Sequence, residues 1–354
     1  MLLIERSFST VECSWIMTIV KSTAIFAAFA GGILGDRIGA RAVILLSFAL
    51  TGFAMLALPF SKTVWLVGGF GVLTIFAQGL FAAPLRILLI KSVGNAHRKE
   101  ALAWLRTGQN AAVLCANGIA YAISNFGLLP IFIFDAVTSF VAFFLGKRLL
   151  PDLRTNVSAV PINEVEDSYK TNLTDFFLIV MLNAGFNILL ELFFVSSAAQ
   201  AKLAFGVRGV EVFSQVMMIN TFLCATLNVW SARLFKSVAF SCILGVLAQY
   251  FAWVIMASSA NNMASYFGSV FLQTIGELSF TALTSFLILK IIPDRGNQGK
   301  IYGVALVFQL GGRAIGAALA FPLLDHANWG VVGGGVLSVM LVVIALIIDR
   351  RLKV

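Results

Sequence analysis

The chain has 354 residues, of which 60% are apolar and only 12% are charged, and it carries a net charge of +9. Soluble proteins contain about 25% charged residues, so the composition excludes soluble domains, a disordered chain and a small disulfide-stapled fold. Apolar runs long enough to cross a bilayer as helices follow one another along the sequence. We therefore predict an all-α integral membrane protein with many spans.

These runs fall into two groups separated by a polar segment that contains prolines and a cluster of acidic residues. Five runs precede this segment and six follow it, at about 15–34, 42–60, 64–90, 101–123, 128–146, 175–196, 211–231, 236–257, 263–290, 302–322 and 329–348. We expect an N-terminal transmembrane bundle at residues 1–148, a cytoplasmic central loop at 149–174 and a C-terminal six-helix bundle at 175–354.

The basic residues are unevenly distributed around the runs. If the loop at 36–41 is cytoplasmic and the sides alternate, 17 Lys and Arg residues are cytoplasmic, 4 are on the opposite side, and 4 lie within the spans or at their ends. By the positive-inside rule this bias sets the orientation and places the C-terminus in the cytoplasm. Because the positive charge is dispersed over short loops, the net charge predicts no nucleic-acid partner.

Reactive side chains are sparse. The four cysteines lie far apart and the two histidines fall in loops. No zinc-protease, serine-hydrolase or phosphate-binding loop motif occurs in the sequence. We expect no enzyme activity, no metal site and no cofactor.

The connection after the first run has a patterned set of small, acidic and basic residues. Gly32, Asp36, Arg37, Gly39 and Arg41 follow the spacing G-x-x-x-D-R-x-G-x-R. Asp36 ends a helix, Gly39 permits a tight turn, and the arginines can pair with acids or face helix carboxyl ends. The pattern resembles the signature loop between helices two and three of the major facilitator superfamily, which implies a role in gating.

A second resemblance covers the later half of the chain. Residues 271–277, the loop at 293–303 and the Gly-rich helix after it resemble helices ten and eleven of bacterial drug:proton antiporters of the MdtH type. This resemblance implies the major facilitator fold, with two pseudo-symmetric bundles, a substrate cavity between them and alternating access. Eleven visible helices then stand against an expected twelve, and we interpret the first as missing. A genuine eleven-helix protein is the alternative.

Two departures from the family pattern weaken drug export and proton antiport more than they weaken the fold. The antiporter motif of the fifth family helix maps onto small residues but lacks its proline; the matching positions are Ala112, Ala116, Asn117 and Ala120. The second copy of the signature loop, near 230–236, keeps basic residues but has lost its Gly and Asp.

Charged side chains inside apolar runs need a reason, because each costs about 2.5–3.5 kcal/mol on insertion scales. Glu277 lies about 21 Å into its run, with Gln273 on the same helical face and Arg313 near the middle of the next helix. A Glu277–Arg313 pair is therefore geometrically possible. Glu277 is either a protonation or substrate site or a structural anchor, and a lasting arginine partner would disfavour proton carriage. We interpret Arg86 and Arg106 as topology anchors at helix ends.

Five further polar residues fall within or beside the runs. Asn187 and Glu191 recur with Asn183 at helical spacing, and we expect this stripe to line the cavity. Lys21 lies near the outer end of its run, where it can extend to the surface. Asp135 lies in an aromatic run and is either a proton-titrating group or a satisfied core acid.

Together these features predict a secondary transporter of a bacterial inner membrane. We expect a monomer that exports an amphipathic organic molecule or drug by alternating access, with protons as the coupling ion and the bilayer as its surroundings. A dedicated exporter of an endogenous metabolite such as a siderophore is the alternative within this class. An integral membrane enzyme and a truncated, non-transporting remnant are the rivals outside it.

Overall fold

The structure is a computed structural model that describes residues 10–93, 97–123, 129–151, 173–205, 209–234, 237–258, 262–291, 298–325 and 327–352. Within these ranges the regular elements are all helices, joined by short connections. The helices are α2 (Thr10–Ile38), α3 (Ala40–Ala57), η1 (Leu58–Phe60), α4 (Val64–Leu80), α5 (Ala82–Lys91), α6 (Arg98–Ile123), α7 (Leu129–Leu149), α8 (Leu173–Phe205), α9 (Gly209–Leu234), α10 (Val238–Ser258), α11 (Met263–Ile291), α12 (Gln298–Asp325) and α13 (Ala327–Leu352).

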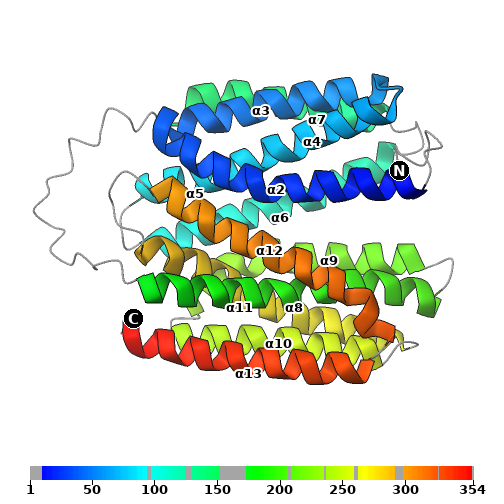
Figure 1. Cartoon of the computed structure of the whole chain (residues 1–354), viewed down its shortest axis with the longest axis vertical. Helices are drawn as coiled ribbons and strands as arrows, with labels where there is room; N and C mark the ends of the chain where they lie inside the picture. Colours follow the sequence, from blue (N-terminus) through cyan, green and yellow to red (C-terminus); the bar gives the residue numbers. More distant parts are fainter. Residues whose placement is uncertain are drawn as a thin grey trace, which may run out of the picture. The chain divides into compact units, whose positions relative to one another are not determined.

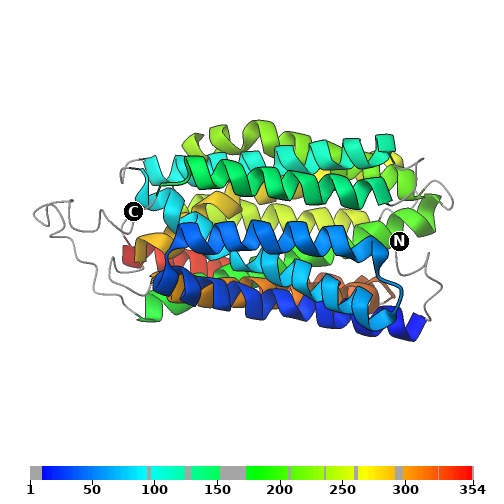
Figure 2. The same cartoon turned by 90° about the horizontal axis from the view of Figure 1, so that it is seen from above.

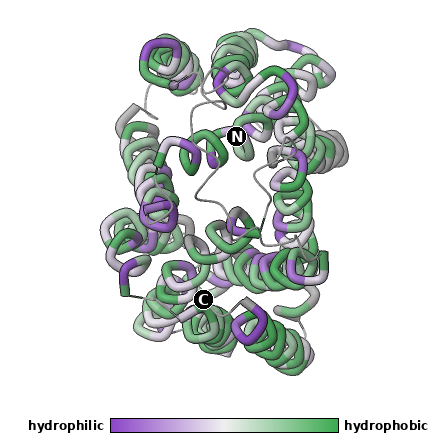
Figure 3. The backbone as a smooth tube through the Cα atoms, turned by 90° about the vertical axis from the view of Figure 1, so that its left-hand side faces the viewer, coloured by the Kyte–Doolittle hydropathy of each residue, from purple (hydrophilic) through white to green (hydrophobic). Residues whose placement is uncertain are grey.

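The described α-helices correspond to the eleven predicted spans, because α4 and α5 are two parts of one span that meet at Phe81. Pro84 explains this break, since proline has no N–H to donate to the carbonyl of residue 80. Nine spans within the described residues are apolar enough to cross a membrane, and the other two helices are α2 and α6. Hydrophobic residues cover most of each helix, with hydrophilic ones at isolated positions (Figure 3).

Contacts divide the chain into two compact units. Unit 1 comprises Met1–Gly94, Ala116–Tyr169 and Ile292–Val307, and unit 2 comprises Asn95–Cys115, Lys170–Ile291 and Phe308–Val354. Helices α6 and α12 thus contribute residues to both units. The division therefore differs from the expected sequential bundles, which stay a prediction, and most of the expected central loop lies outside the described residues.

In unit 1, α3 packs against both α4 and α7, and α2 packs against α4 (Figure 1). The buried Ser47 hydroxyl donates to the Ala77 carbonyl, 2.7 Å away, and so joins α3 to α4. Gly31 of α2 permits close approach to α4, because a Cβ built there would lie 2.1 Å from the Leu80 carbonyl oxygen. Small residues thus set the helix spacing, as is usual between membrane helices.

In unit 2, α10 packs against α8, α11 and α13, and these helices run alongside one another (Figure 2). Trp253 of α10 belongs to a buried apolar cluster to which α8, α9, α11 and α12 also contribute. Gly245 and Gly276 bring α10 and α11 together, since a Cβ on Gly276 would lie 2.9 Å from the Gly245 carbonyl oxygen. Phe186 of α8 stacks on Phe280 of α11 with ring centroids 3.8 Å apart.

Two adjacent glycines of α12 test this packing. A Cβ on Gly312 would lie 2.3 Å from the carbonyl oxygen of Ala184 in α8, whereas a Cβ on Gly311 would meet nothing within 4 Å. We expect Gly312→Ala to lower the free energy of unfolding by about 1–3 kcal/mol, because the helix backbones must separate. Gly311→Ala should leave it unchanged or raise it by up to about 1 kcal/mol through helix propensity. Thermal unfolding of both variants in the same detergent measures the difference, and equal melting temperatures would contradict it.

Candidate functional site

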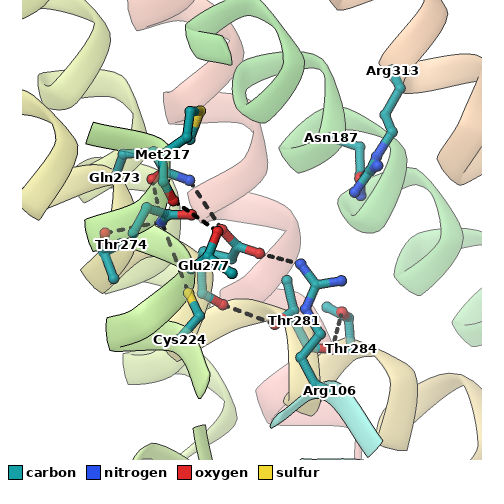
Figure 4. A network of polar contacts seen from close by, with 12 residues as sticks. Arg106, Asn187, Met217, Cys224, Gln273, Thr274, Glu277, Thr281, Thr284 and Arg313 are labelled. Carbon is teal, nitrogen blue, oxygen red and sulfur yellow. Dashed lines mark hydrogen bonds and ion pairs between the residues drawn. The ribbon is translucent and has the colours of Figure 1, made fainter. Parts of the chain in front are cut away.

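A buried carboxylate forms the centre of a polar network in unit 2. Glu277 lies in the middle of α11, is only 4% exposed, and accepts a charge-assisted hydrogen bond from the guanidinium of Arg106 in α6 (Figure 4). Both residues belong to unit 2. An ion pair in a low-dielectric interior is stable only if each charge keeps its partner, and removing one partner of such a pair costs about 3–5 kcal/mol.

The partner of Glu277 differs from the one that the sequence suggests. From the sequence, a Glu277–Arg313 pair is geometrically possible and Arg106 is a topology anchor at a helix end. In the structure α6 begins at Arg98, so Arg106 lies about two turns inside the helix, from where its long side chain reaches Glu277. In this structure Arg106 therefore forms an internal ion pair with Glu277 in place of an anchor at a helix end, and the role of Arg313 stays a prediction.

Amides extend the network from Glu277 to α9. Gln273 donates from Nε2 to Oε2 of Glu277 at 3.1 Å, as its position one turn earlier on the same face predicts. Asn220 of α9 donates from Nδ2 to Oε1 of Gln273 at 2.8 Å and to Oγ1 of Thr274 at 3.0 Å. Asn220, Gln273 and Thr274 are all buried, so these groups satisfy one another in place of water.

Arg313 belongs to a second polar contact, between α8 and α12. Its Nε donates to Oδ1 of Asn187 at 3.0 Å, and Asn187 donates from Nδ2 to the backbone carbonyl of Asn183 at 2.8 Å. The predicted spacing thus brings Asn183 and Asn187 into contact. Glu191, one turn further along α8, is half-buried beside the close approach of Gly316. That this stripe lines a cavity stays a prediction.

The signature loop caps a distant helix within unit 1. Asp36 ends α2 and accepts hydrogen bonds from the backbone N–H groups of Gly299 and Lys300, both at 2.8 Å, at the start of α12. These N–H groups have no partner within the helix, and a carboxylate there also interacts favourably with the helix dipole. Gly39 has φ of 92°, so this glycine makes the turn between α2 and α3 as predicted.

Two further contacts hold the same loop: a close approach of two backbones, and a hydrogen bond to a carbonyl at the carboxyl end of α7. A Cβ on Gly32 would lie 2.0 Å from the Gly299 carbonyl oxygen, so α2 and the start of α12 touch through glycines. The Arg41 guanidinium donates to the carbonyl of Lys147 in the last turn of α7, which agrees with the expected use of arginine at a helix end.

Two further ion pairs lie at helix ends of unit 2. Arg233, in the last turn of α9, pairs with Glu100 in the first turn of α6, just before the apolar run. The hydrogen bond from Arg233 lowers the pKa of Glu100. The contact therefore stabilises the folded protein at a pH above the ordinary carboxyl pKa, and this stabilisation is lost as the pH falls through the lowered pKa. Arg351 of α13 pairs with Asp175 of α8 at 2.7 Å.

The remaining sequence candidates lie outside this network. Asp135 is half-buried in α7 and belongs to unit 1, whereas Glu277 belongs to unit 2. Lys21 lies on α2, and its side chain is outside the described part of the structure. Among the described residues, no group of three or more His, Cys, Asp or Glu side chains could hold a metal ion.

Sequence reasoning missed Arg106, Asn220 and Glu100 as members of these contacts. Arg106 carried a usable signal, because an arginine eight residues after the first charged residue of its helix is too deep to be at the helix end. Asn220 and Cys224 recur four residues apart within an apolar run, a polar stripe of the kind that identified Asn187.

Comparisons with known proteins agree with this architecture. A family model described as Major Facilitator Superfamily matches residues 2–317. No protein with a curated description matches the sequence. The closer resemblance to drug:proton antiporters of the MdtH type stays a prediction.

Solved transporter structures share the fold at low sequence identity. A bacterial homologue of the iron transporter ferroportin, in an outward-facing state, matches with 16% identity and a TM-score of 0.73 over 99% of this chain and 93% of that chain. The proton:xylose symporter XylE bound to 6-bromo-6-deoxy-D-glucose matches with 13% identity and a TM-score of 0.73 over 98% and 87%. A POT family transporter in complex with a thioalcohol-conjugated peptide matches with 14% identity and a TM-score of 0.66 over 97% and 88%. These matches confirm the predicted all-α major facilitator fold.

The cap formed by Asp36 is testable against a second cap in the same chain. Asp36→Asn keeps an acceptor but removes the charge that faces the start of α12, which should cost about 0.3–1 kcal/mol of stability and impair transport at normal abundance. Asp349 supplies the control, because it accepts from the Ala239 N–H at the start of α10 in a similar way. Asp349→Asn should lose similar stability and keep transport. Equal transport rates for both variants, measured at matched abundance, would show that the signature loop has no special role.

Proposed function

The chain belongs to the major facilitator superfamily of secondary transporters, and on this premise we propose that it exports an amphipathic organic molecule in exchange for protons. It is a multi-pass membrane transporter and not an enzyme, as family membership implies. A bacterial inner membrane, a cytoplasmic C-terminus and a monomeric state complete the proposal.

The observation that carries the proposal is the ion pair between Glu277 and Arg106, and proton carriage requires that this pair break in one of the access states. A carboxylate that is 4% exposed inside a membrane helix is stabilised by its arginine. Protonation of Glu277 removes its charge and therefore weakens this contact, and an acceptor group of a substrate can take its place on Arg106. Proton and substrate would then compete for one site, which is the basis of exchange between them.

The surroundings of the pair support a substrate with both polar and apolar parts. Phe186 and Phe280 form a stacked pair, and Phe280 lies one turn from Glu277 on α11. Arg106 and Gln273 supply charged and amide donors beside Glu277. The direction of transport rests on the resemblance of residues 271–277, the loop at 293–303 and the helix after it to exporters. A symporter of similar fold is proton-coupled by its description, which supports protons as the coupling ion.

Substitution of Glu277 by glutamine tests proton coupling. Glu277→Gln keeps the shape and the hydrogen bonds of the side chain while removing titration, so it should abolish uphill export and spare substrate binding. Comparison of deletion and overexpression strains over a panel of fluorescent amphipathic dyes first identifies a transported dye. Proteoliposomes with an imposed pH gradient then report dye transport and, through a trapped pH indicator, proton movement.

Asp175→Asn is the matched control, because it also breaks a carboxylate–arginine pair of unit 2, at a helix end. This variant should retain coupled transport. If Glu277→Gln still pumps with unchanged pH dependence, Glu277 is a structural anchor, and Glu191 or Asp135 becomes the next residue to test.

A further inference from the structure

The hydrogen bonds that lead to Glu277 run in one direction, and this direction is set at Thr274. The Thr274 hydroxyl donates its single proton to the carbonyl of Val270, 2.8 Å away in the preceding turn of α11. Its oxygen can then only accept, and it accepts from the amide nitrogen of Asn220 at 3.0 Å. Asn220 must therefore present its NH₂ group, and not its oxygen, toward α11.

The direction passes from Asn220 to the carboxylate through Gln273. The same Asn220 nitrogen donates to Oε1 of Gln273, 2.8 Å away. With its oxygen engaged, Gln273 presents Nε2 to Oε2 of Glu277 at 3.1 Å. A donor at this position is satisfied by an ionised carboxylate oxygen and conflicts with a protonated one, which carries its own O–H.

Burial of these side chains restricts each amide to one orientation. Gln273 is 0% exposed, Thr274 is 1% and Asn220 is 5% exposed. Bulk water therefore does not reach these groups to replace a lost hydrogen bond, and a misdirected amide leaves buried groups unsatisfied at a real free-energy cost. The orientation of Thr274 therefore fixes that of Asn220, which in turn fixes that of Gln273.

We propose that Asn220 is a positioning residue that holds Glu277 in its ionised, Arg106-bound form, and that protonation of Glu277 on Oε2, the oxygen that faces Gln273, requires the amides of Gln273 and Asn220 to reverse. The proposal deepens the proposed function, because it rests on Glu277 as the residue that takes up the proton. It adds α9, through Asn220, to the elements that respond to the proton.

The reversal can be followed atom by atom. Protonated Glu277 donates from Oε2, so Gln273 turns its oxygen toward it and its NH₂ group toward Asn220. Asn220 then turns its own oxygen to accept this bond, and its NH₂ group no longer faces Thr274. The protonation state of an α11 side chain is thereby converted into the orientation of an α9 side chain.

Other ionisable groups surround Glu277, and one of them, Cys224, also contacts Asn220, whose Nδ2 lies 3.9 Å from the Cys224 sulfur. Arg106 approaches from α6, Cys224 from α9 and Arg313 from α12, and each interacts electrostatically with the carboxylate. The faces of α8 and α10 packed nearest to it present Phe186 to Phe280 and Gly245 to Gly276. Asn220→Leu also removes the contact to Cys224, whereas Thr274→Val leaves all of these groups and their contacts in place.

Infrared spectroscopy of the purified, reconstituted full-length protein over a pH series, without substrate, measures the protonated carboxyl directly. The band of Glu277 is assigned by its loss in Glu277→Gln. Asn220→Leu removes the donor that fixes Gln273, and Thr274→Val removes the acceptor that fixes Asn220. We expect each to raise the ratio of protonated to ionised Glu277 at a given pH, by about tenfold for Asn220→Leu, which is the effect of about one hydrogen bond to a charged group.

Ser279→Ala is the control, because Ser279 is a buried hydroxyl of α11 that bonds to the carbonyl of Gly276 outside this chain of bonds. It should leave the ratio unchanged. A Glu277 band identical to wild type in both Asn220→Leu and Thr274→Val, or an equal shift in Ser279→Ala, would overturn the proposal. If Asn220→Leu does not fold, Thr274→Val decides alone.

The infrared test of Asn220 and the transport test of Glu277 can fail independently of each other. If Glu277→Gln transports with unchanged pH dependence while Asn220→Leu still shifts the Glu277 band, the positioning role stands and proton coupling through Glu277 fails. If Glu277→Gln loses coupling while the band is unmoved in both variants, coupling stands and the positioning role fails.

Discussion

A carboxylate inside an apolar helix bundle must have a partner, and in this protein that requirement organises the polar contacts of unit 2. Glu277 is nearly inaccessible, and Arg106 meets its charge from α6. Desolvation of two charges costs several kcal/mol for each ion, so the pair needs further hydrogen bonds. Gln273 provides one of these to Glu277 and is itself held by Asn220. Helices α6, α9 and α11 are thereby linked around one charge.

Away from this buried charge, helices are held together by hydrogen bonds to backbone groups and by close contacts at glycines. At the start of α12, the amide N–H groups have no helical partners, and Asp36 supplies an acceptor from α2. Gly32 and Gly299 allow this approach because neither carries a side chain. Between α10 and α11, Gly245 and Gly276 make a similar contact. In lipid, where no hydrophobic driving force brings helices together, such close packing provides the stability.

Features that depend on neighbouring residues in the sequence were predictable. The spans follow from the length of the apolar runs, the turn at Gly39 follows from glycine's access to positive φ, and the Gln273–Glu277 contact follows from four-residue spacing. The superfamily could be suspected from the signature loop alone.

Contacts between distant segments were not predictable in the same way. Arg106 and Glu277 are 171 residues apart, and from the sequence Arg313, near the middle of its helix, was a possible partner while Arg106 was assigned to a helix end. The choice depends on which helix faces α11, and one sequence contains no signal for that. The pairing of Arg233 with Glu100 is similar, because the second signature loop lost its acidic residue and its remaining arginine meets an acid from another segment.

The central claim is that Glu277 and Arg106 stabilise unit 2 as a pair and not as separate residues. A double-mutant cycle of Arg106→Met and Glu277→Met, followed by thermal or denaturant unfolding in one detergent, tests this directly. Arg106→Met leaves the buried Glu277 without its partner and should cost about 3–5 kcal/mol. Glu277→Met leaves Arg106, whose side chain is 26% exposed, and should cost less, and the double variant should recover most of the larger loss. A double variant whose loss equals the sum of the two single losses would contradict the account.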